Sequence, residues 1–326
     1  MGSSAVRSFS DPDEYDRAIR ASDVSGLRLA KRGFQSEITR VDLGAVWMQR
    51  FQETAPRLLR VAVHPSRSAV LFRTPGGNGG VRHRGKDFGD DVMMFLGSGA
   101  VDNQTSDGPI GFGSVSLSPT DLARFGLLLA ERDLIAPRTT TMIRPPPNAL
   151  ARLRLLHAGA ARLARTDPHR LEHEEVSRAL EDSLITAMVD CLGRAEPIRG
   201  SYAGERRAAL IRRMDEHLQE QDDFPVYVTE LCQALGVSER SLERACQDHL
   251  SMGPKRYLGL RRLHMARRAL IGSDPSCSTV SQIALAHGFW ELGRFAVRYQ
   301  QAFGEPPSAT LRGLSAAPRR PGRHSR

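Results

Sequence analysis

The first third of the chain alternates short apolar runs with turn-forming residues. The runs are too brief for helices, and we expect strands within Leu43–Phe51, Leu58–Val63, Ala69–Phe72, Val92–Leu96 and Ile110–Leu117. Glycine- and proline-rich turns separate them, for example at residues 75–80 and 107–109. Short strands at this spacing predict a sandwich or a small barrel over residues 1–118, with a short helix from about Ser10 to Ile19 ahead of it.

The pattern changes to a helical period at Ser118. This serine is a suitable N-cap because Pro119 follows at the first helical position, and the helix should run to about Arg132. Two longer helices follow, at about residues 149–165 and 172–192, and each carries an apolar stripe. The stripes are Leu153, Leu156, Ala160 and Leu163 in the first helix and Val176, Leu180, Leu184, Ala187 and Cys191 in the second. They could pack against the β-rich region or form a homodimer face, and periodicity alone does not separate the two.

A pattern that occurs twice dominates the last third of the chain. The stretch VTELCQALGVSERSLERACQ, residues 228–247, matches VSQIALAHGFWELGRFAVRYQ, residues 280–300. Leu231 aligns with Ile283 and Gly236 with Gly288 at an offset of 52 residues, whereas Leu242 aligns with Phe295 at an offset of 53. The second copy therefore has one extra residue after its glycine.

Each copy has the spacing of a helix-turn-helix unit. The glycine permits the positive φ that a tight turn between two helices requires. Apolar residues on both sides of the turn would pack the second helix on the first, and we assign the following to the core: Leu231, Leu235, Leu242, Ile283, Phe289, Phe295 and Phe303. One such match is weak, because many helical hairpins share it, but two copies at a fixed offset with arginines on the second helices indicate DNA binding.

Seven helices fit residues 205–314, which we expect to be one domain. The fourth begins at Pro254 and places Arg261 and Arg268 opposite its apolar face, while the seventh begins near Pro307. Residues 194–204 are expected to be the linker between the two domains. The first domain, residues 1–200, would contain a β-rich part (1–118) and a helical part (119–193), and it would sense an effector or mediate dimerisation. Residues 315–326 should be a disordered basic tail.

The charge distribution supports a polyanionic partner. The net charge is +9, and residues 205–326 hold 19 Arg and Lys against 13 Asp and Glu. Most of the positive charge therefore lies with the repeat, as a phosphate-binding surface requires.

Residues that could support other chemistry are scattered. His64 and His83 are isolated, and the sequence has no nucleophile elbow and no phosphate-binding glycine loop, so we predict no catalytic residues, no metal and no cofactor. The four cysteines form no C-x-x-C pair, which is typical of a reducing cytosol. No apolar run is long enough to span a bilayer and the N-terminus has no hydrophobic segment, so we expect a cytoplasmic protein without a membrane partner.

Residues 210–312 resemble the DNA-binding domain of the AraC/XylS family of bacterial transcription regulators. The resemblance covers both repeat units, the fourth helix PKRYLGLRRLHMARRAL and the closing string GFWELGRFAVRYQQAFGEPPSATLR. The stretch FSDPDEYDRAI more loosely resembles the cupin-like regulatory domain that many members carry. The expected fold class is therefore α+β: a β-rich cupin-like barrel with packed helices, then an all-α domain with two helix-turn-helix units.

The resemblance implies that two recognition helices enter successive segments of the major groove of promoter DNA. The DNA-binding candidates it implies are Ser238, Arg240, Ser241, Glu243, Arg244, Arg261, Leu292, Gly293, Arg294, Val297 and Arg298. Arginine can bind guanine in a bidentate manner and Glu243 can accept from cytosine, although Glu243 could equally pair with Arg240 or Gln247. Leu292 and Gly293 lack polar reach, so the second unit would read thymine methyl groups or mainly position the backbone.

The prediction is a sequence-specific transcription regulator rather than an enzyme. That it activates transcription and contacts RNA polymerase is implied only by the resemblance; a small-molecule effector and a homodimer are further expectations. Two alternatives remain open: an architectural DNA binder without sequence preference, and a barrel enzyme with a DNA-binding attachment.

Overall fold

The computed structural model describes residues 2–20, 22–28, 34–97, 99, 101–198, 202–221 and 225–313. The chain divides into two units. The β-rich unit comprises Met1–Gly26, Gly33–Arg212 and Asp248–Ser251, and the helical unit comprises Leu27–Arg32, Arg213–Gln247 and Met252–Arg326. The fold is α+β, as the sequence predicts. The predicted basic tail, 315–326, lies outside the described residues.

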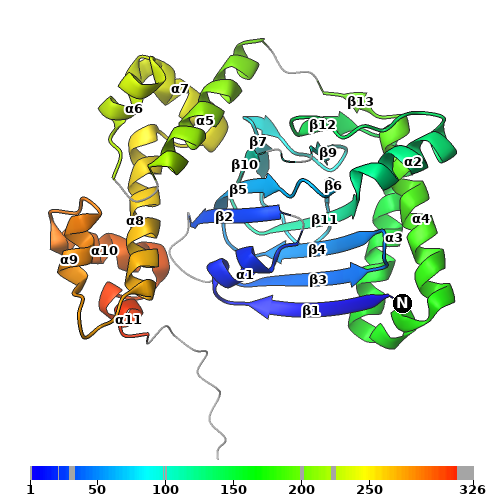
Figure 1. Cartoon of the computed structure of the whole chain (residues 1–326), viewed down its shortest axis with the longest axis horizontal. Coiled ribbons are helices and arrows are strands. Elements are labelled where there is room, and N and C mark those ends of the chain that lie inside the picture. Colours follow the sequence, from blue (N-terminus) through cyan, green and yellow to red (C-terminus); the bar gives the residue numbers. More distant parts are fainter. Residues whose placement is uncertain are drawn as a thin grey trace, which may run out of the picture. The chain divides into compact units, whose positions relative to one another are not determined.

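Two sheets make up the body of the β-rich unit (Figure 1). The larger sheet has the order β1 (Ser3–Phe9), β3 (Ser36–Asp42), β4 (Trp47–Glu53), β11 (Ile110–Leu117), β6 (Ser68–Arg73), β9 (Met93–Leu96), β12 (Thr141–Arg144) and β13 (Glu196–Pro197). The smaller sheet has the order β2 (Ser22–Arg28), β5 (Arg57–Val63), β10 (Val101–Ser106), β7 (Val81–His83) and β8 (Lys86–Asp87). Each of the five expected apolar runs overlaps a strand.

The first predicted run, Leu43–Phe51, is too long at its N-terminal end. Residues 43–46 form the turn between β3 and β4, closed by a hydrogen bond from Leu43 N–H to the carbonyl of Val46 (3.0 Å). The carboxylate of Glu181 accepts from the backbone N–H groups of Ala45 (2.7 Å) and Val46 (3.1 Å). The side chains of Leu43 and Val46 are buried in the hydrophobic core of this unit although the backbone forms a turn, and periodicity does not distinguish this arrangement from a strand.

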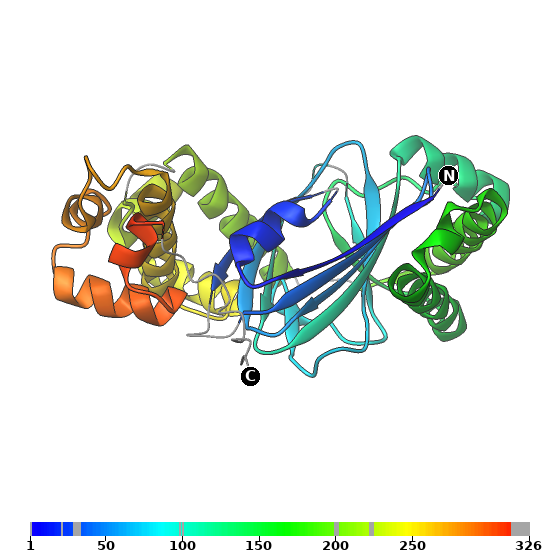
Figure 2. The same ribbon diagram turned by 90° about the horizontal axis from the view of Figure 1, so that it is seen from below.

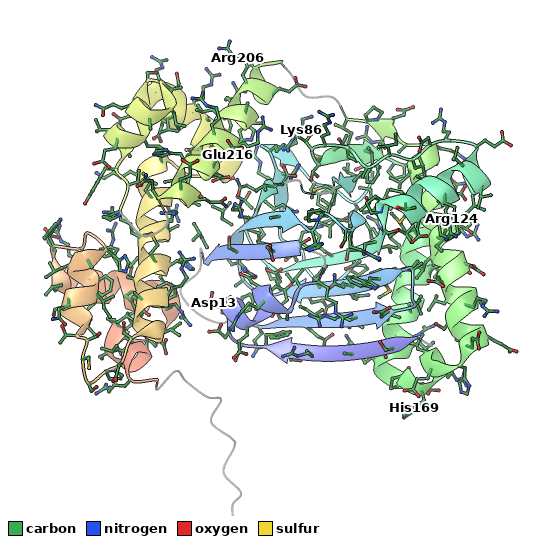
Figure 3. All side chains as sticks on the ribbon, viewed as in Figure 1. Asp13, Lys86, Arg124, His169, Arg206 and Glu216 are labelled. Atoms are coloured by element: carbon green, nitrogen blue, oxygen red, sulfur yellow. The ribbon has the colours of Figure 1, made fainter. Side chains whose placement is uncertain are left out.

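The helices of the β-rich unit pack on the larger sheet. Besides α1 (Pro12–Ala18), they are α2 (Pro119–Ala130), α3 (Pro147–Thr166), the 3₁₀ helix η1 (Pro168–Glu172) and α4 (Glu174–Gly193). Ser118 caps α2 by accepting from Asp121 N–H (3.0 Å), as predicted. Figure 2 shows α3 and α4 side by side against the sheet, and charged side chains such as Arg124 and His169 lie on the exposed surface (Figure 3).

The apolar stripes of α3 and α4 belong to the core of this unit. Leu153 and Leu184 are fully buried in one cluster with Met48 and Val115 of the larger sheet. Val176 is the stripe residue that stays most accessible, at 38% exposure. The packing therefore agrees with the first of the two interpretations of the stripes, and a homodimer through another surface stays a prediction.

The segment expected as a linker, residues 194–204, is partly structured. Pro197 of β13 pairs with Ile143 of β12, and Ile198 N–H donates to the carbonyl of Met142 (2.8 Å). The next helix already begins at Tyr202. The proline and glycine residues of this stretch predicted a linker. The pairing of β13 with β12 joins residues more than fifty positions apart, so the local sequence gives no sign of it.

The helical unit contains the expected helices. They are α5 (Tyr202–Glu220), whose residues from Arg213 onward belong to this unit, α6 (Val228–Leu235), α7 (Glu239–Leu250), α8 (Pro254–Gly272), α9 (Val280–Ala286), α10 (Leu292–Phe303) and α11 (Pro307–Leu311) (Figure 1). The seven residues assigned to the core of the repeat are all buried, from Leu231 at 0% to Phe289 at 8% exposure. One cluster joins α8, through Leu263 and Leu270, to the second repeat unit.

Candidate nucleic-acid interface

The two repeat units fold as two helix-turn-helix units. In the first, α6 ends at Gly236, which has φ 65°, and α7 follows; in the second, α9 leads through Gly288, with φ 75°, to α10. A residue with a Cβ is strained in this left-handed conformation, so glycine is needed at both turns. Because Leu242 and Phe295 are equivalent, Arg240 and Arg244 of α7 occupy the same helix positions as Gly293 and Val297 of α10.

The predicted contact residues of α7 share its accessible side. Arg240, Ser241, Glu243 and Arg244 are exposed, whereas Leu242, Ala245 and Cys246 on the other side are fully buried. Ser238 precedes the helix and accepts from Ser241 N–H at 3.2 Å, which fixes the first turn. The first unit thus presents two arginines from one rigid helix face.

Glu243 has a neighbour that the sequence did not suggest. Its Oε1 lies 2.6 Å from where a Cβ of Gly253 would stand, so the carboxylate occupies space that this glycine leaves open. Gly253 is the N-cap of α8, and a helix N-terminus favours a nearby negative charge. The Glu243 carboxylate therefore lies at the junction of α7 and α8, and cytosine recognition by Glu243 stays a prediction.

The predicted residues of α10 are accessible but mostly apolar. Leu292 is 38% exposed and Val297 is 56% exposed, and Gly293 and Arg298 are exposed as well. Arg294 forms an ion pair of 2.6 Å with Glu291, with both side chains largely in solvent. Trp290 was not among the predicted contact residues, and it is 75% exposed just before the helix. Its position in the sequence, between the turn glycine and α10, could have identified it as a candidate.

Helix α8 ties the two units together. The guanidinium of Arg262 lies over the rings of Tyr227, before α6, and Phe289, after the second turn, at 5.1 and 5.6 Å from the ring centroids. Arg261, which we predicted as a DNA contact, donates to the carbonyl of Leu218 in α5 and is partly exposed. This bond fixes the guanidinium beside α5, and a DNA contact by Arg261 stays a prediction.

The Cys246 thiol of this unit is buried beside a methionine. Burial raises the pKa of the Cys246 thiol to about 12, and its sulfur lies 3.9 Å from that of Met214. All four cysteines of the chain are free thiols. Across the described residues, no group of three or more His, Cys, Asp and Glu side chains could hold a metal ion.

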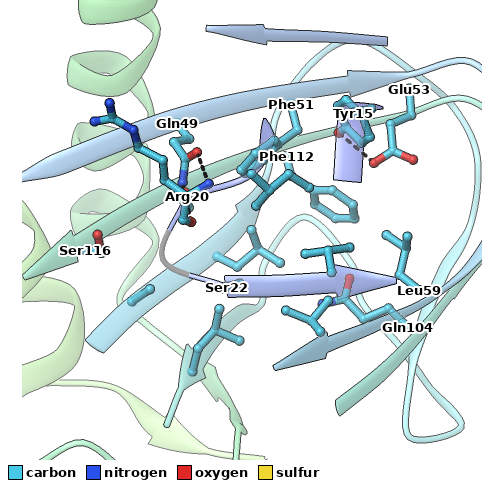
Figure 4. Close-up of a pocket in the computed structure, with 17 residues that line it drawn as sticks. Tyr15, Arg20, Ser22, Gln49, Phe51, Glu53, Leu59, Gln104, Phe112 and Ser116 are labelled. Atoms are coloured by element: carbon cyan, nitrogen blue, oxygen red, sulfur yellow. Dashed lines mark hydrogen bonds between the residues drawn. The ribbon is translucent and has the colours of Figure 1, made fainter. Parts of the chain in front are cut away.

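A cavity of about 70 Å³ lies between the two sheets of the β-rich unit (Figure 4). Its walls are mainly apolar, with Phe51 and Phe112 from the larger sheet and Leu59 from the smaller one. The amide of Gln104 and the hydroxyl of Ser114, both almost fully buried, add hydrogen-bonding groups. This kind of lining is typical of small-molecule sites, whereas the volume is well below the roughly 300–1,000 Å³ that such sites usually have.

On one side the cavity is lined by Tyr15 of α1, by Ile19 and Arg20 after this helix, and by Ser22 and Val24 of β2. Arg20 N–H donates to Gln49 Oε1 (2.9 Å) and Gln49 Nε2 donates to the carbonyl of Arg20 (3.0 Å), which attaches the segment after α1 to β4 (Figure 4). The Tyr15 hydroxyl donates to Glu53 (2.8 Å). Within the described parts of the chain, no helix is both long and apolar enough to cross a membrane.

Comparison with known proteins shows similarity mainly in the helical unit. A model described as "Helix-turn-helix domain" matches residues 231–313. The chain is 32% identical over 152 residues to the "Probable thc operon regulatory protein" of Rhodococcus erythropolis, covering 44% of this chain and 46% of that protein. It is 37% identical over 102 residues to the "XylDLEGF operon transcriptional activator" of Pseudomonas putida, covering 31% of each.

The match thus spans less than half the length of these two relatives. Among solved structures, the AraC-like transcriptional activator CuxR aligns with a TM-score of 0.40 and 15% identity, over 80% of this chain and 95% of that one. The family model and both relatives agree with the resemblance drawn from the two repeat units. Through its C-terminal helix-turn-helix domain, the chain is similar to regulators of the AraC/XylS family.

Proposed function

We propose that this protein is a sequence-specific transcription regulator that places α7 and α10 in successive segments of the major groove. The observation that carries the proposal is the pair of helix-turn-helix units, joined by α8, whose second helices each present an accessible face. Two such helices on one side of a duplex contact elements about one helical turn, ~34 Å, apart.

Arg240 and Arg244 are the residues we expect to read guanine. Both are exposed on the same face of α7, one helical turn apart, and an arginine that binds guanine O6 and N7 discriminates by about 1–3 kcal/mol. The surrounding positive charge, 19 Arg and Lys against 13 Asp and Glu in residues 205–326, supplies phosphate attraction that does not depend on sequence.

The test is recovery of bound duplexes from a genomic fragment library at physiological salt. We expect a motif with two elements one turn apart, and we expect Arg240→Ala and Arg244→Ala to lose affinity at particular bases of one element. Arg178→Ala is the matched control, because Arg178 is an exposed helical arginine of the β-rich unit, paired with Glu174. Equal retention of all fragments would favour the architectural alternative and refute sequence-specific regulation.

The cavity between the sheets is the proposed effector site. Its apolar walls and the buried groups of Gln104 and Ser114 suit a small, mostly apolar molecule with a hydrogen-bonding group. Its volume of about 70 Å³ is below the ~150 Å³ that accommodates benzene, so a larger ligand requires α1 or β2 to shift. No catalytic chemistry enters this proposal, and the enzyme alternative would be supported only by turnover of a ligand.

A thermal-shift screen with phenols, small alcohols and the matching carboxylates tests the effector site. A ligand at a hundred times its dissociation constant should stabilise the chain by about 2.7 kcal/mol. Ala69→Leu, which fills the cavity, and Gln104→Leu, which removes the amide, should abolish the shift without changing DNA affinity. We further propose that the protein is a cytoplasmic homodimer that contacts RNA polymerase and activates transcription rather than repressing it. Transcription assays with purified polymerase test activation, and sedimentation tests the homodimer.

A further inference from the structure

The two recognition helices differ at the positions that face outward. Where α7 carries Arg240 and Arg244, α10 carries Gly293 and Val297 at the equivalent positions. The two units therefore share the same pattern of buried residues, whereas these two accessible positions are cationic in α7 and apolar in α10. Any recognition by the second unit must use a different chemistry from that of the first.

Among the described residues, neither a turn nor a close contact requires glycine at position 293. It is the second residue of α10, it does not have a positive φ, and a Cβ built there meets no heavy atom of the described residues within 4 Å. Glycine is a poor helix former compared with alanine. The missing side chain thus costs helix stability without serving a turn or a close internal contact, and it leaves the helix backbone open to a molecule from outside.

Gly293 lies within an apolar strip, which we define as Leu292, Gly293, Ala296 and Val297. Spacings of one, four and five residues place these positions on one side of α10. All four are exposed, Leu292 at 38% and Val297 at 56%. Arg294 and Arg298 are next to the strip along the helix, so cationic groups border an apolar centre.

DNA rather than a protein is the occupant that these observations favour. The strip has the same register as the arginine pair of α7, and arginines border it in a domain of net positive charge. In the major groove, the edge of one base alone presents an apolar group, the C5 methyl of thymine. An apolar helix face that approaches the groove closely can therefore select thymine by contact with that methyl group.

We propose that α10 recognises thymine methyl groups through Leu292 and Val297, and that Gly293 lets the helix backbone come close enough for these contacts. The inference rests on the proposed function and adds the chemistry by which the second helix-turn-helix unit recognises DNA. The regulator would then read one DNA element by hydrogen bonds from arginine and the other by apolar contact.

The first experiment replaces thymine by uracil, one position at a time, in the duplex recovered from the fragment library. Uracil pairs like thymine and lacks only the methyl group. We expect about a fourfold loss of affinity at one or two thymines of the element that Arg240→Ala and Arg244→Ala leave unaffected, the factor that burying one such carbon supplies. At the thymine that Val297 contacts, the loss should shrink in Val297→Ala, which removes both Cγ methyl groups of the valine, and it should persist in Arg244→Ala.

The second experiment compares Gly293→Ala with Gly159→Ala. Both glycines lie within helices, and a Cβ at either one meets no heavy atom of the described residues within 4 Å. Neither change should lower the thermal midpoint, since alanine is the better helix former. Gly293→Ala should weaken DNA binding by about fivefold or more, because an extra methyl group at a close-packed interface forces the helix away. Gly159→Ala, in the β-rich unit, should leave DNA binding unchanged.

The outcomes separate this inference from the function on which it rests. If no motif is recovered, both fail. If a motif is recovered and uracil at every thymine leaves affinity within about twofold, below the effect of one buried carbon, the methyl contact is refuted and the regulator stands. If Val297→Ala keeps full DNA affinity and instead loses transcription activation with purified polymerase, the strip binds protein and the inference is wrong.

Discussion

His157 of α3 donates its Nε2–H to the backbone carbonyl of Gln49 in β4, at 2.9 Å, in a fully buried site. The same Gln49 uses its side chain on the cavity side of the sheet to hold the backbone of Arg20. One strand residue therefore connects the covering helix, the larger sheet and the segment after α1 that lines the cavity. The His157 ring also fits beside Gly113, where a Cβ would come within 2.8 Å of it.

We predict that His157 makes stability depend on pH. Burial lowers the pKa of His157 to about 4, from an ordinary value of 6.5. As the pH falls from about 6.5 towards 4, the unfolded chain binds a proton that the folded chain does not, so the free energy of unfolding falls by up to about 3 kcal/mol. Urea unfolding at pH 7 and pH 5 measures this.

The control for this prediction is His157→Gln, whose amide can still donate to Gln49 but does not titrate. It should be less stable at pH 7 and should lose less stability on acidification than the parent chain. Equal losses in the two proteins would show that His157 does not carry the pH dependence.

Arg57 should be essential for folding of the β-rich unit. It is 1% exposed, donates to Asp16, and lies 3.3 Å from the carboxylate of Glu53. Its guanidinium also lies over the rings of Tyr15 and Phe34. Arg57→Met leaves two buried carboxylates without their cation, and we expect a loss of about 3–5 kcal/mol in urea unfolding.

The matched change is Arg17→Met, since Arg17 is an exposed arginine of α1 that donates to the carbonyl of Asp13. This variant should stay within about 0.5 kcal/mol of the parent, as surface substitutions do. Similar losses for the two variants would argue against the buried cluster as the cause. Burial also raises the pKa of Asp16 to about 6, consistent with a carboxyl that depends on Arg57 for its charge.

Arg262 should couple the two helix-turn-helix units. Its guanidinium lies between Tyr227 of the first unit and Phe289 of the second, and each such contact contributes about 0.5–1 kcal/mol. Arg262→Met should therefore weaken binding to a duplex with both elements more than binding to either element alone. Arg268→Met, at an exposed position of the same helix, is the comparison. A uniform loss on all three duplexes would mean that Arg262 serves only folding or phosphate binding.

Trp290 should report DNA binding directly. Its indole is 75% exposed just before α10, and the sequence has one other tryptophan, Trp47. In a Trp47→Phe variant, addition of the recovered duplex should change the intensity and wavelength of Trp290 emission, because the indole leaves bulk water. A nonspecific duplex at matched salt is the control. Unchanged emission at saturating duplex would place Trp290, and with it the start of α10, away from the DNA.

The sequence alone determined the features that depend on neighbouring residues. The two helix-turn-helix units followed from a glycine at each turn and from apolar spacing within about twenty residues, and Ser118 was identified as a cap for the same reason. Fold class and the buried positions of the repeat followed as well, since helix periodicity is a local property.

The tertiary structure decided what depends on distant contacts. Strand β10, VDNQTS, carries no apolar run, so nothing local marks it; it forms because β5 and β7 pair with it on either side. Arg57 and Arg261 look like surface arginines in the sequence, and their partners, Asp16 and the carbonyl of Leu218, lie more than forty residues away. Burial and pairing of a side chain are set by packing between segments, and a residue's neighbours along the chain do not contain that information.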